Sequence, residues 1–252
     1  MSGHSKWHQI RHKKALTDAK RGKAFTQIIK EITIAARLGG ADPAGNPRLR
    51  LAIEKAKSNN MPADNIKRAI MKGTGELPGM AYEEATYEVY GPGGAAILIE
   101  VVTDNKTRAV SEIRHTLDRN HGKLAATGAV AYQFHKKGQI TLPKSKMAED
   151  DLLGIILEAG ADDLSSDDEH FTVTCSPETF EAVKKAIEQR GVPLDHAELQ
   201  MIAENTVKVE GKDAELLLKL MEALEDHDDV QHVYSNFDID ESVLAGFNAG
   251  AS

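Results

Sequence analysis

Charge divides this chain into two parts of opposite sign. Residues 1–75 contain 16 Lys or Arg and 5 Asp or Glu, a net charge of +11, whereas residues 76–252 contain 15 and 34, a net charge of −19. A strongly basic segment attached to an acidic body is typical of a protein that binds a polyanion, either nucleic acid or a charged membrane surface. A solvated helical face is the simpler interpretation of the same charge run.

Composition limits the cores and cofactors that this chain can have. Its 252 residues are enough for two or three domains, and aromatic residues make up only 5%, so Ile, Leu, Val and Ala must form most of the cores. The single cysteine, Cys175, excludes an intrachain disulfide and a Cys-based zinc site. It lies in a β-rich run, 171–175, and is predicted to be a small buried apolar residue.

Hydropathy and the single cysteine together indicate a soluble protein of a reducing compartment. Residues 1–6 lack the apolar core of a signal peptide. The longest strongly apolar runs, such as 95–99, are far shorter than a membrane span. We therefore expect a cytoplasmic protein without a membrane partner.

The basic segment is predicted to form helices. In the first, about 17–38, one apolar face combines Phe25, Ile28, Ile29, Ile32, Ala35 and Ala36. Lys23, Lys30 and Arg37 are seven residues apart and share a second face. Gly39-Gly40 ends this helix.

Two shorter basic helices follow. Asn46-Pro47 supplies a cap and a first-turn proline for a helix with Leu49, Ala52, Ile53 and Ala56 inside. Pro62 opens a third helix that is apolar at 66, 69 and 70, basic at 67, 68 and 72, and ended by 73–75. The prediction is a small helical domain whose outer surfaces are cationic.

After residue 75 the pattern changes to mixed strands and helices. Two β-rich runs, 86–90 and 95–103, are joined by the hairpin signal Gly91-Pro92-Gly93-Gly94. Adjacent strand pairs favour an α+β fold with antiparallel sheets. We predict further strands near 129–134, 139–142, 171–175, 198–202, 206–209 and 230–237, and helices at 107–120, 149–158, 177–189 and 214–224. Residues 245–252 are predicted to fray.

The N-terminal tail is the most distinctive local feature. It has no acidic residue before Asp18, and its only tryptophan, Trp7, lies among cations, as an aromatic that stacks on a base does. Anchoring of the tail in a groove is the alternative role for Trp7. His4, His8 and His12 are four apart, but no carboxylate or thiol is close in sequence, so no metal site is predicted.

Other motifs favour structure over catalysis. The loop 91–94 lacks a P-loop lysine and is predicted to turn a hairpin. The segment 103–108 suits either an anion at a helix N-terminus or ordinary capping. Residues 147–183 contain 11 acids and no Lys or Arg. They lack the EF-hand pattern and are interpreted as a solvated acidic face that repels phosphate. No catalytic motif is present, so we expect no enzyme, cofactor or small-molecule substrate.

Several stretches together resemble the YebC/PmpR family of probable transcriptional regulators, which includes the mitochondrial translational activator of cytochrome c oxidase. Order and spacing agree over nearly the whole chain. Val89 and Leu124-Ala125-Ala126 depart from the usual family pattern and affect only local turns. The matching stretches are 3–7, 11–14, 20–23, 39–43, 46–50, 59–62, 64–70, 90–94, 103–105 and 134–138.

The resemblance implies a three-domain crescent without catalytic residues. Its expected domains are a basic helical domain (1–77), a discontinuous α+β domain (78–136 with 205–240), and an inserted acidic α+β domain (137–204). Family members are described as DNA-binding transcriptional regulators and as ribosome-associated translation factors that assist proline-rich stretches.

We therefore predict a non-enzymatic, nucleic-acid-binding regulator of gene expression, with DNA-binding transcriptional control as the first reading. A ribosome-associated factor that binds ribosomal RNA is the alternative, because diffuse positive charge suits backbone contact. The N-terminal domain is expected to make the contacts. The predicted nucleic-acid-binding residues are Lys6, Trp7, Arg11, Lys13, Lys14, Lys20, Arg21, Lys23, Lys30, Arg37, Arg48, Arg50, Lys67 and Arg68.

Overall fold

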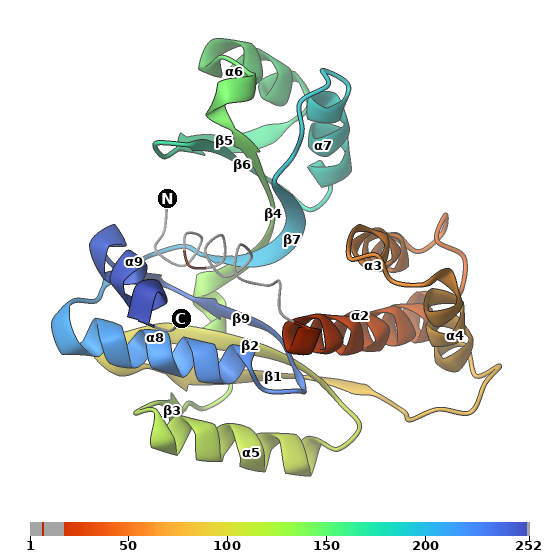
Figure 1. Cartoon of the computed structure of the whole chain (residues 1–252), viewed down its shortest axis with the longest axis vertical. Coiled ribbons are helices and arrows are strands. Elements are labelled where there is room, and N and C mark those ends of the chain that lie inside the picture. The colour runs from red at the N-terminus through yellow and green to blue at the C-terminus, as the bar shows by residue number, and fades with distance from the viewer. Residues whose placement is uncertain (1–6, 8–17, 251–252) are drawn as a thin grey trace.

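The protein consists of one helical body and two bodies built on β-sheets (Figure 1). The structure is a computed structural model that describes residue 7 and residues 18–250. The helical body and the second-sheet body project from the first sheet in different directions (Figure 1). Within the described residues, no helix is both long and apolar enough to cross a membrane.

The helical body contains α2 (Asp18–Gly39), α3 (Pro47–Ser58) and α4 (Ala63–Gly73). Both α3 and α4 pack on α2, and the apolar faces predicted from the sequence form their common core. The side chain of Asn46 accepts a hydrogen bond from the Leu49 backbone N–H, which confirms the predicted cap of α3. Gly40, with φ of +84°, follows the end of α2 as expected.

The first sheet is antiparallel, with strand order β3-β1-β2-β9. Its strands are β1 (Glu83–Tyr90), β2 (Ala96–Thr103), β3 (Lys123–Leu124) and β9 (Val230–Ser235). Alternate residues of β2 pack against α5 (Lys106–Arg119) and α8 (Gly211–Glu225) in the largest core. The loop 91–94 joins β1 to β2 and contains the 3-10 turn η1 (Pro92–Gly94), so the predicted hairpin is confirmed.

The second sheet is also antiparallel, with strand order β5-β6-β4-β7. Its strands are β4 (Phe134–Pro143), β5 (Ala161–Ser166), β6 (His170–Cys175) and β7 (His196–Ala203). The helices α6 (Glu149–Glu158) and α7 (Phe180–Glu188) supply the rest of its core. Cys175 is buried there, as predicted, and burial raises the pKa of its thiol.

The chain leaves the first sheet, builds the second, and then returns. β9 pairs with β2 although the whole second sheet lies between them in sequence. β8 (Val207–Lys208) pairs in parallel with β10 (Phe237–Asp238), although α8 and β9 separate these two strands in sequence. This topology supports a discontinuous middle domain, whereas the boundaries at 136 and 204 stay a prediction, since β4 runs through the first of them.

Three local predictions were wrong. Residues 129–133 form a loop and the 3-10 turn η2 (Ala131–Gln133), because the Glu88 carboxylate accepts hydrogen bonds from backbone N–H groups of this segment. The strand β5 was missed, since its sequence Ala-Asp-Asp-Leu-Ser-Ser has little β-propensity. The expected frayed tail is helix α9 (Glu241–Gly250), held because Leu244 and Phe247 pack on the largest core. The short turn η3 (Lys144–Lys146) follows β4.

Close approach of α4 to α2 requires glycine at position 73. A Cβ on Gly73 would overlap the carbonyl oxygen of Thr33 and lie 2.9 Å from the Cβ of Ala36. We therefore expect Gly73→Ala to lower the free energy of unfolding by about 1–3 kcal/mol. Urea denaturation followed by circular dichroism measures this change.

Gly154, inside α6, provides the matched control, because nothing lies within 4 Å of its added Cβ. Gly154→Ala is expected to raise the free energy of unfolding by about 0.5–1 kcal/mol through helix propensity. Two alanine variants of equal stability would contradict the packing argument.

Candidate nucleic-acid interface

The predicted cationic stripe of α2 bonds to protein oxygens, with Lys30 buried, Lys23 half-buried and Arg37 exposed. Lys23 Nζ donates to the Glu225 carbonyl at 2.6 Å, and Arg37 Nη1 donates to the Tyr82 carbonyl at 2.9 Å. Between them, Lys30 reaches the turn from α8 to β9. The seven-residue spacing therefore does place the three side chains on one side of α2. That side lies along the seam, the contact between α2 and the first-sheet body.

Lys30 makes a buried ion pair in this seam. Its Nζ lies 2.7 Å from Asp229 Oδ1 and 2.9 Å from the Asp228 carbonyl, and only 6% of the residue is exposed. Asp229 also accepts hydrogen bonds from Thr103 and Arg108, at 2.9 and 2.7 Å. Burial favours the neutral acid, but the hydrogen bonds and charges of Lys30 and its neighbours outweigh it and lower the pKa of Asp229. Lys30 is thus a structural residue, which corrects its assignment to nucleic acid.

Trp7 is an anchor in this structure. Its side chain is fully buried in the first-sheet core, and its Nε1 donates to Glu225 Oε1 at 2.7 Å. Its ring centroid lies 5.9 Å from that of Phe247 on α9. An indole enclosed in this way has no face to offer a base, so the stacking role assigned to Trp7 is wrong for this conformation.

Arg48 and Arg50 are half-buried and bond to protein groups. Arg48 forms a bidentate pair with Glu31, at 2.6 and 2.9 Å, and a further pair with Glu84 at 2.6 Å. Burial opposes its charge, but both glutamates outweigh burial and raise the pKa of Arg48. Arg50 is half-buried and donates to the Pro43 carbonyl at 3.3 Å. The predicted phosphate-binding role of Arg48 is therefore corrected to an internal link.

The helical body also contacts the second-sheet body through α3. Glu54 pairs with Lys184 of α7 at 2.9 Å, and Lys55 lies 4.0 Å from Glu198 of β7. Leu51 packs against the second-sheet core. One face of α3 is consequently occupied by protein and cannot contact nucleic acid.

Four cations of α3 and α4 remain directed to solvent. All are exposed, and in the part of the chain that the structure describes none of them forms an ion pair. Arg68 donates to Asn65 Oδ1 on its own helix at 2.8 Å. Lys67 and Arg68 were predicted as nucleic-acid-binding residues, whereas the other two were not. These residues, called the α3–α4 cations below, are Lys57, Lys67, Arg68 and Lys72.

Six predicted residues cannot be placed. Lys6, Arg11, Lys13 and Lys14 lie outside the described residues, as do His4, His8 and His12 of the tail. Lys20 and Arg21 lie in α2, but their side chains are not among those described. Their role stays a prediction.

The segment 103–108 is occupied by protein groups. The Asn105 side chain caps α5 by accepting from the Arg108 backbone N–H at 3.0 Å, and Arg108 pairs with Asp104 and Asp229. Lys106 pairs with Glu83 at 2.8 Å. Capping therefore explains this motif.

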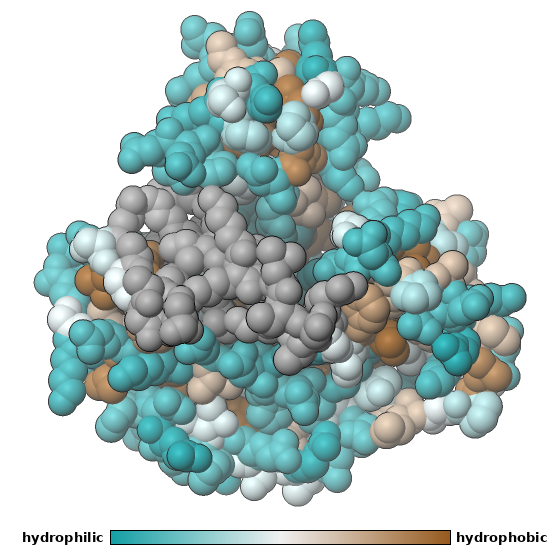
Figure 2. All heavy atoms as spheres, viewed as in Figure 1, coloured by the Kyte–Doolittle hydropathy of each residue, from teal (hydrophilic) through white to brown (hydrophobic). Residues whose placement is uncertain are grey.

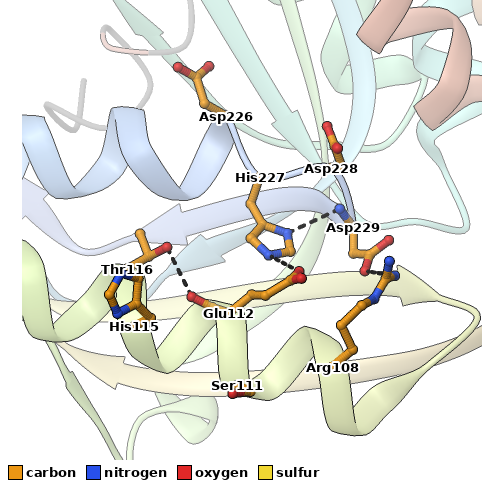
Figure 3. A pocket seen from close by; sticks show the side chains of 9 residues that line it. All are labelled: Arg108, Ser111, Glu112, His115, Thr116, Asp226, His227, Asp228 and Asp229. Atoms are coloured by element: carbon orange, nitrogen blue, oxygen red, sulfur yellow. Dashed lines mark hydrogen bonds and ion pairs between the residues drawn. The ribbon is translucent and has the colours of Figure 1, made fainter.

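Beside it lies an open depression of about 620 Å³, lined by α5 and the turn after α8 (Figure 3). Within it, Glu112, His227 and Asp229 come close enough to suggest a metal site. His227 points at Glu112, with Nε2 at 3.2 Å, while its Nδ1 accepts from the Asp229 backbone N–H at 3.1 Å (Figure 3). Both ring nitrogens are used and Asp229 is already paired, so the donor set is not arranged for a metal.

The acidic segment of the second-sheet body is likewise structural. Asp167 accepts from the backbone N–H groups of Glu169 and His170, and Asp162 pairs with Lys137 at 2.7 Å. Among the described residues, these acids do not converge on a common point. The acid-rich face remains exposed and negative.

Comparison with known proteins agrees with this architecture. The family model for the TACO1/YebC protein N-terminal domain matches residues 5–76, and the model for the TACO1/YebC second and third domain matches residues 82–237. The chain belongs to the TACO1/YebC family.

Relatives match over their full length. Proteins from Chlorobaculum parvum and Solibacter usitatus, each called "Probable transcriptional regulatory protein", are 55% and 57% identical to this chain. Each alignment covers 97% of this chain and 98% of the relative. A crystal structure of a conserved hypothetical protein from Aquifex aeolicus has a TM-score of 0.80 and 45% identity, and the match covers 89% of this chain and 93% of that one. These relatives confirm the predicted family and its α+β fold of three domains.

The buried pair of the α2 seam generates a stability prediction. We expect Lys30→Met to lower the free energy of unfolding by about 3 kcal/mol, because it leaves a buried carboxylate with fewer partners. Lys67→Met, which removes the same charge from an exposed site, is expected to change it by less than about 0.5 kcal/mol. Urea denaturation of both variants beside the parent protein measures the difference, and similar values for the two would refute a structural role for Lys30.

Proposed function

We propose that this protein is a non-enzymatic, nucleic-acid-binding regulator of gene expression, acting in the cytoplasm without a cofactor. The observation that carries this proposal is the solvent-facing set of α3–α4 cations on a chain that is otherwise acidic. The names of its relatives describe regulators of transcription. DNA is therefore the first partner to test.

Charge complementarity supports contact through the helical body. The α3–α4 cations belong to the part of the chain with net charge +11, and the rest carries −19. A polyanion is attracted to the first and repelled by the second. Figure 2 shows a mostly hydrophilic surface over the described residues of the visible face, which suits a polar ligand.

The geometry of α4 favours phosphate contact. Ile66 and Ala69 hold the helix against α2, so its opposite face presents Lys67, Arg68 and Lys72. Lysine ammonium groups recognise phosphate as point charges, and arginine adds hydrogen bonds in a fixed geometry. Binding of this kind depends on charge more than on sequence.

A ribosome-associated role is the second candidate, because the α3–α4 cations are divided between two helices. Such a surface fits the sugar–phosphate backbone of a folded RNA. In that case the partner is ribosomal RNA, and the regulated step is translation.

Removal of the α3–α4 cations is expected to weaken nucleic-acid binding strongly. Each phosphate contact with duplex DNA contributes about −0.9 to the slope of log affinity against log salt, so alanine at all four positions flattens it by up to about 3.6. Fluorescence anisotropy with a labelled duplex at several salt concentrations measures both quantities. Replacement of four exposed cations of the other bodies gives the matched control with the same charge change: Lys185, Arg190, Lys212 and Lys219. Equal losses of affinity in the two variants would show that binding depends on net charge alone and not on the position of the α3–α4 cations.

Arg68→Ala separates sequence reading from backbone contact. If Arg68 contacts a base edge, the variant loses about 1–3 kcal/mol of preference for a promoter over scrambled DNA. If it contacts phosphate, both DNAs weaken equally and co-sedimentation with ribosomes falls in parallel. We expect the uniform loss, because the α3–α4 cations are divided between two helices instead of forming one row. In-cell crosslinking of the parent protein to promoter DNA and to ribosomal RNA then identifies the partner.

A further inference from the structure

A solvent-exposed tyrosine lies in the loop that leads from β3 to β4. Tyr132, in η2, is 70% exposed, the largest fraction among the exposed large hydrophobic residues of the described chain. A side chain of this size gains nothing for folding when its ring stands in water. The first-sheet and second-sheet cores both lie close to this loop in sequence, yet neither takes up the ring.

Hydrogen bonds to a buried glutamate of β1 hold the backbone of the loop that carries Tyr132. Glu88 of β1, only 6% exposed, accepts hydrogen bonds from the backbone N–H groups of Gly128, Val130 and Ala131 at 2.5, 2.7 and 2.8 Å. Burial opposes the charge of Glu88, but these N–H groups outweigh it and lower the pKa of its carboxyl.

Two further contacts fix the same loop. Tyr90 Oη donates to the Ala129 carbonyl at 3.3 Å, and Val130 is fully buried beside Phe134. The backbone on either side of Tyr132 is thus set before any ligand arrives. A pre-organised ring loses less conformational entropy on binding than a mobile one.

The loop also lies within the one long stretch of the acidic part that contains no acid. Residues 119–148 include no Asp or Glu, although residues 76–252 as a whole carry −19. Within it Lys137 pairs with Asp162, whereas Arg119, Lys123 and Lys136 are exposed. Lys123 lies opposite Tyr90 in the register of β3 with β1. In sequence the exposed ring thus lies between exposed cations, and an aromatic ring combined with cations is what binds unpaired nucleotides.

We propose that Tyr132 is a stacking platform for an unpaired base, with Lys123 and Lys136 attracting the adjoining phosphates. This site is separate from the α3–α4 cations and rests on the proposed function, which it extends from charge contact to recognition of single-stranded or looped nucleic acid. A continuous duplex hides its base faces in the stack, so only its ends present a base on which Tyr132 can stack. The ligand class is therefore an RNA loop or a single-stranded segment of RNA or DNA.

The test compares Tyr132→Ala with Tyr132→Phe on four labelled probes by fluorescence anisotropy. The probes are an RNA hairpin with an unpaired loop, single-stranded RNA, single-stranded DNA of the same sequence, and a DNA duplex closed at both ends by covalent linkers. We expect Tyr132→Ala to weaken hairpin or single-strand binding about 10-fold, with duplex binding unchanged. Tyr132→Phe, which keeps the ring, should bind like the parent protein. The two single strands show whether the base comes from RNA or DNA.

Leu157→Ala on α6 is the control for loss of an exposed apolar side chain, since Leu157 is 62% exposed. Unchanged hairpin and single-strand binding by Tyr132→Ala overturns the inference, as does an equal loss on the duplex. If the variant without the α3–α4 cations loses all probes while Tyr132→Ala keeps them, the proposed function stands and the stacking site falls. If the parent protein binds no probe, the proposed function fails and the stacking site fails with it.

Discussion

The buried contact between Lys30 and Asp229 determines how the helical body is placed on the rest of the molecule. It joins α2 to the turn between α8 and β9, and Asp229 in turn holds Arg108 at the start of α5. Two opposite charges removed from water must stay close, because either alone is costly. Lys23 and Gln27 add hydrogen bonds to backbone carbonyls of the same turn region. The orientation of α2, and with it the exposed sides of α3 and α4, therefore depends on this pair and the hydrogen bonds around it.

Positive charge in the helical body consequently has two uses. Cations on α2 bind carbonyl and carboxylate oxygens of the first-sheet body, and Arg48 links α2 to β1 through Glu31 and Glu84. Those on the outer sides of α3 and α4 are directed to solvent. Net charge predicts that a basic segment meets oxygen atoms, but it does not distinguish oxygens of the protein from those of a phosphate.

Local pattern was sufficient for most of the fold. The apolar spacing of 25–36, the Asn46-Pro47 cap and the loop at 91–94 each depend on neighbours in sequence, and each prediction was confirmed. The failures involve partners far along the chain. Residues 129–133 are β-prone, but Glu88, some 40 positions earlier, bonds their N–H groups. The roles of Trp7 and Lys30 were misassigned for the same reason, since Glu225 and Asp229 lie about 200 positions away.

The same long separation in sequence has a consequence during synthesis of the protein on the ribosome. Lys30 and Asp229 are 199 positions apart, and the turn that receives α2 exists only when β9 has joined β2. At about 5–20 residues per second, the ribosome adds those positions in about 10–40 s. During that interval the basic helices have emerged while their acidic docking site has not been made. The nascent segment therefore carries its full positive charge beside the ribosome's own RNA, and the completed first sheet is what withdraws Lys23 and Lys30 from that encounter.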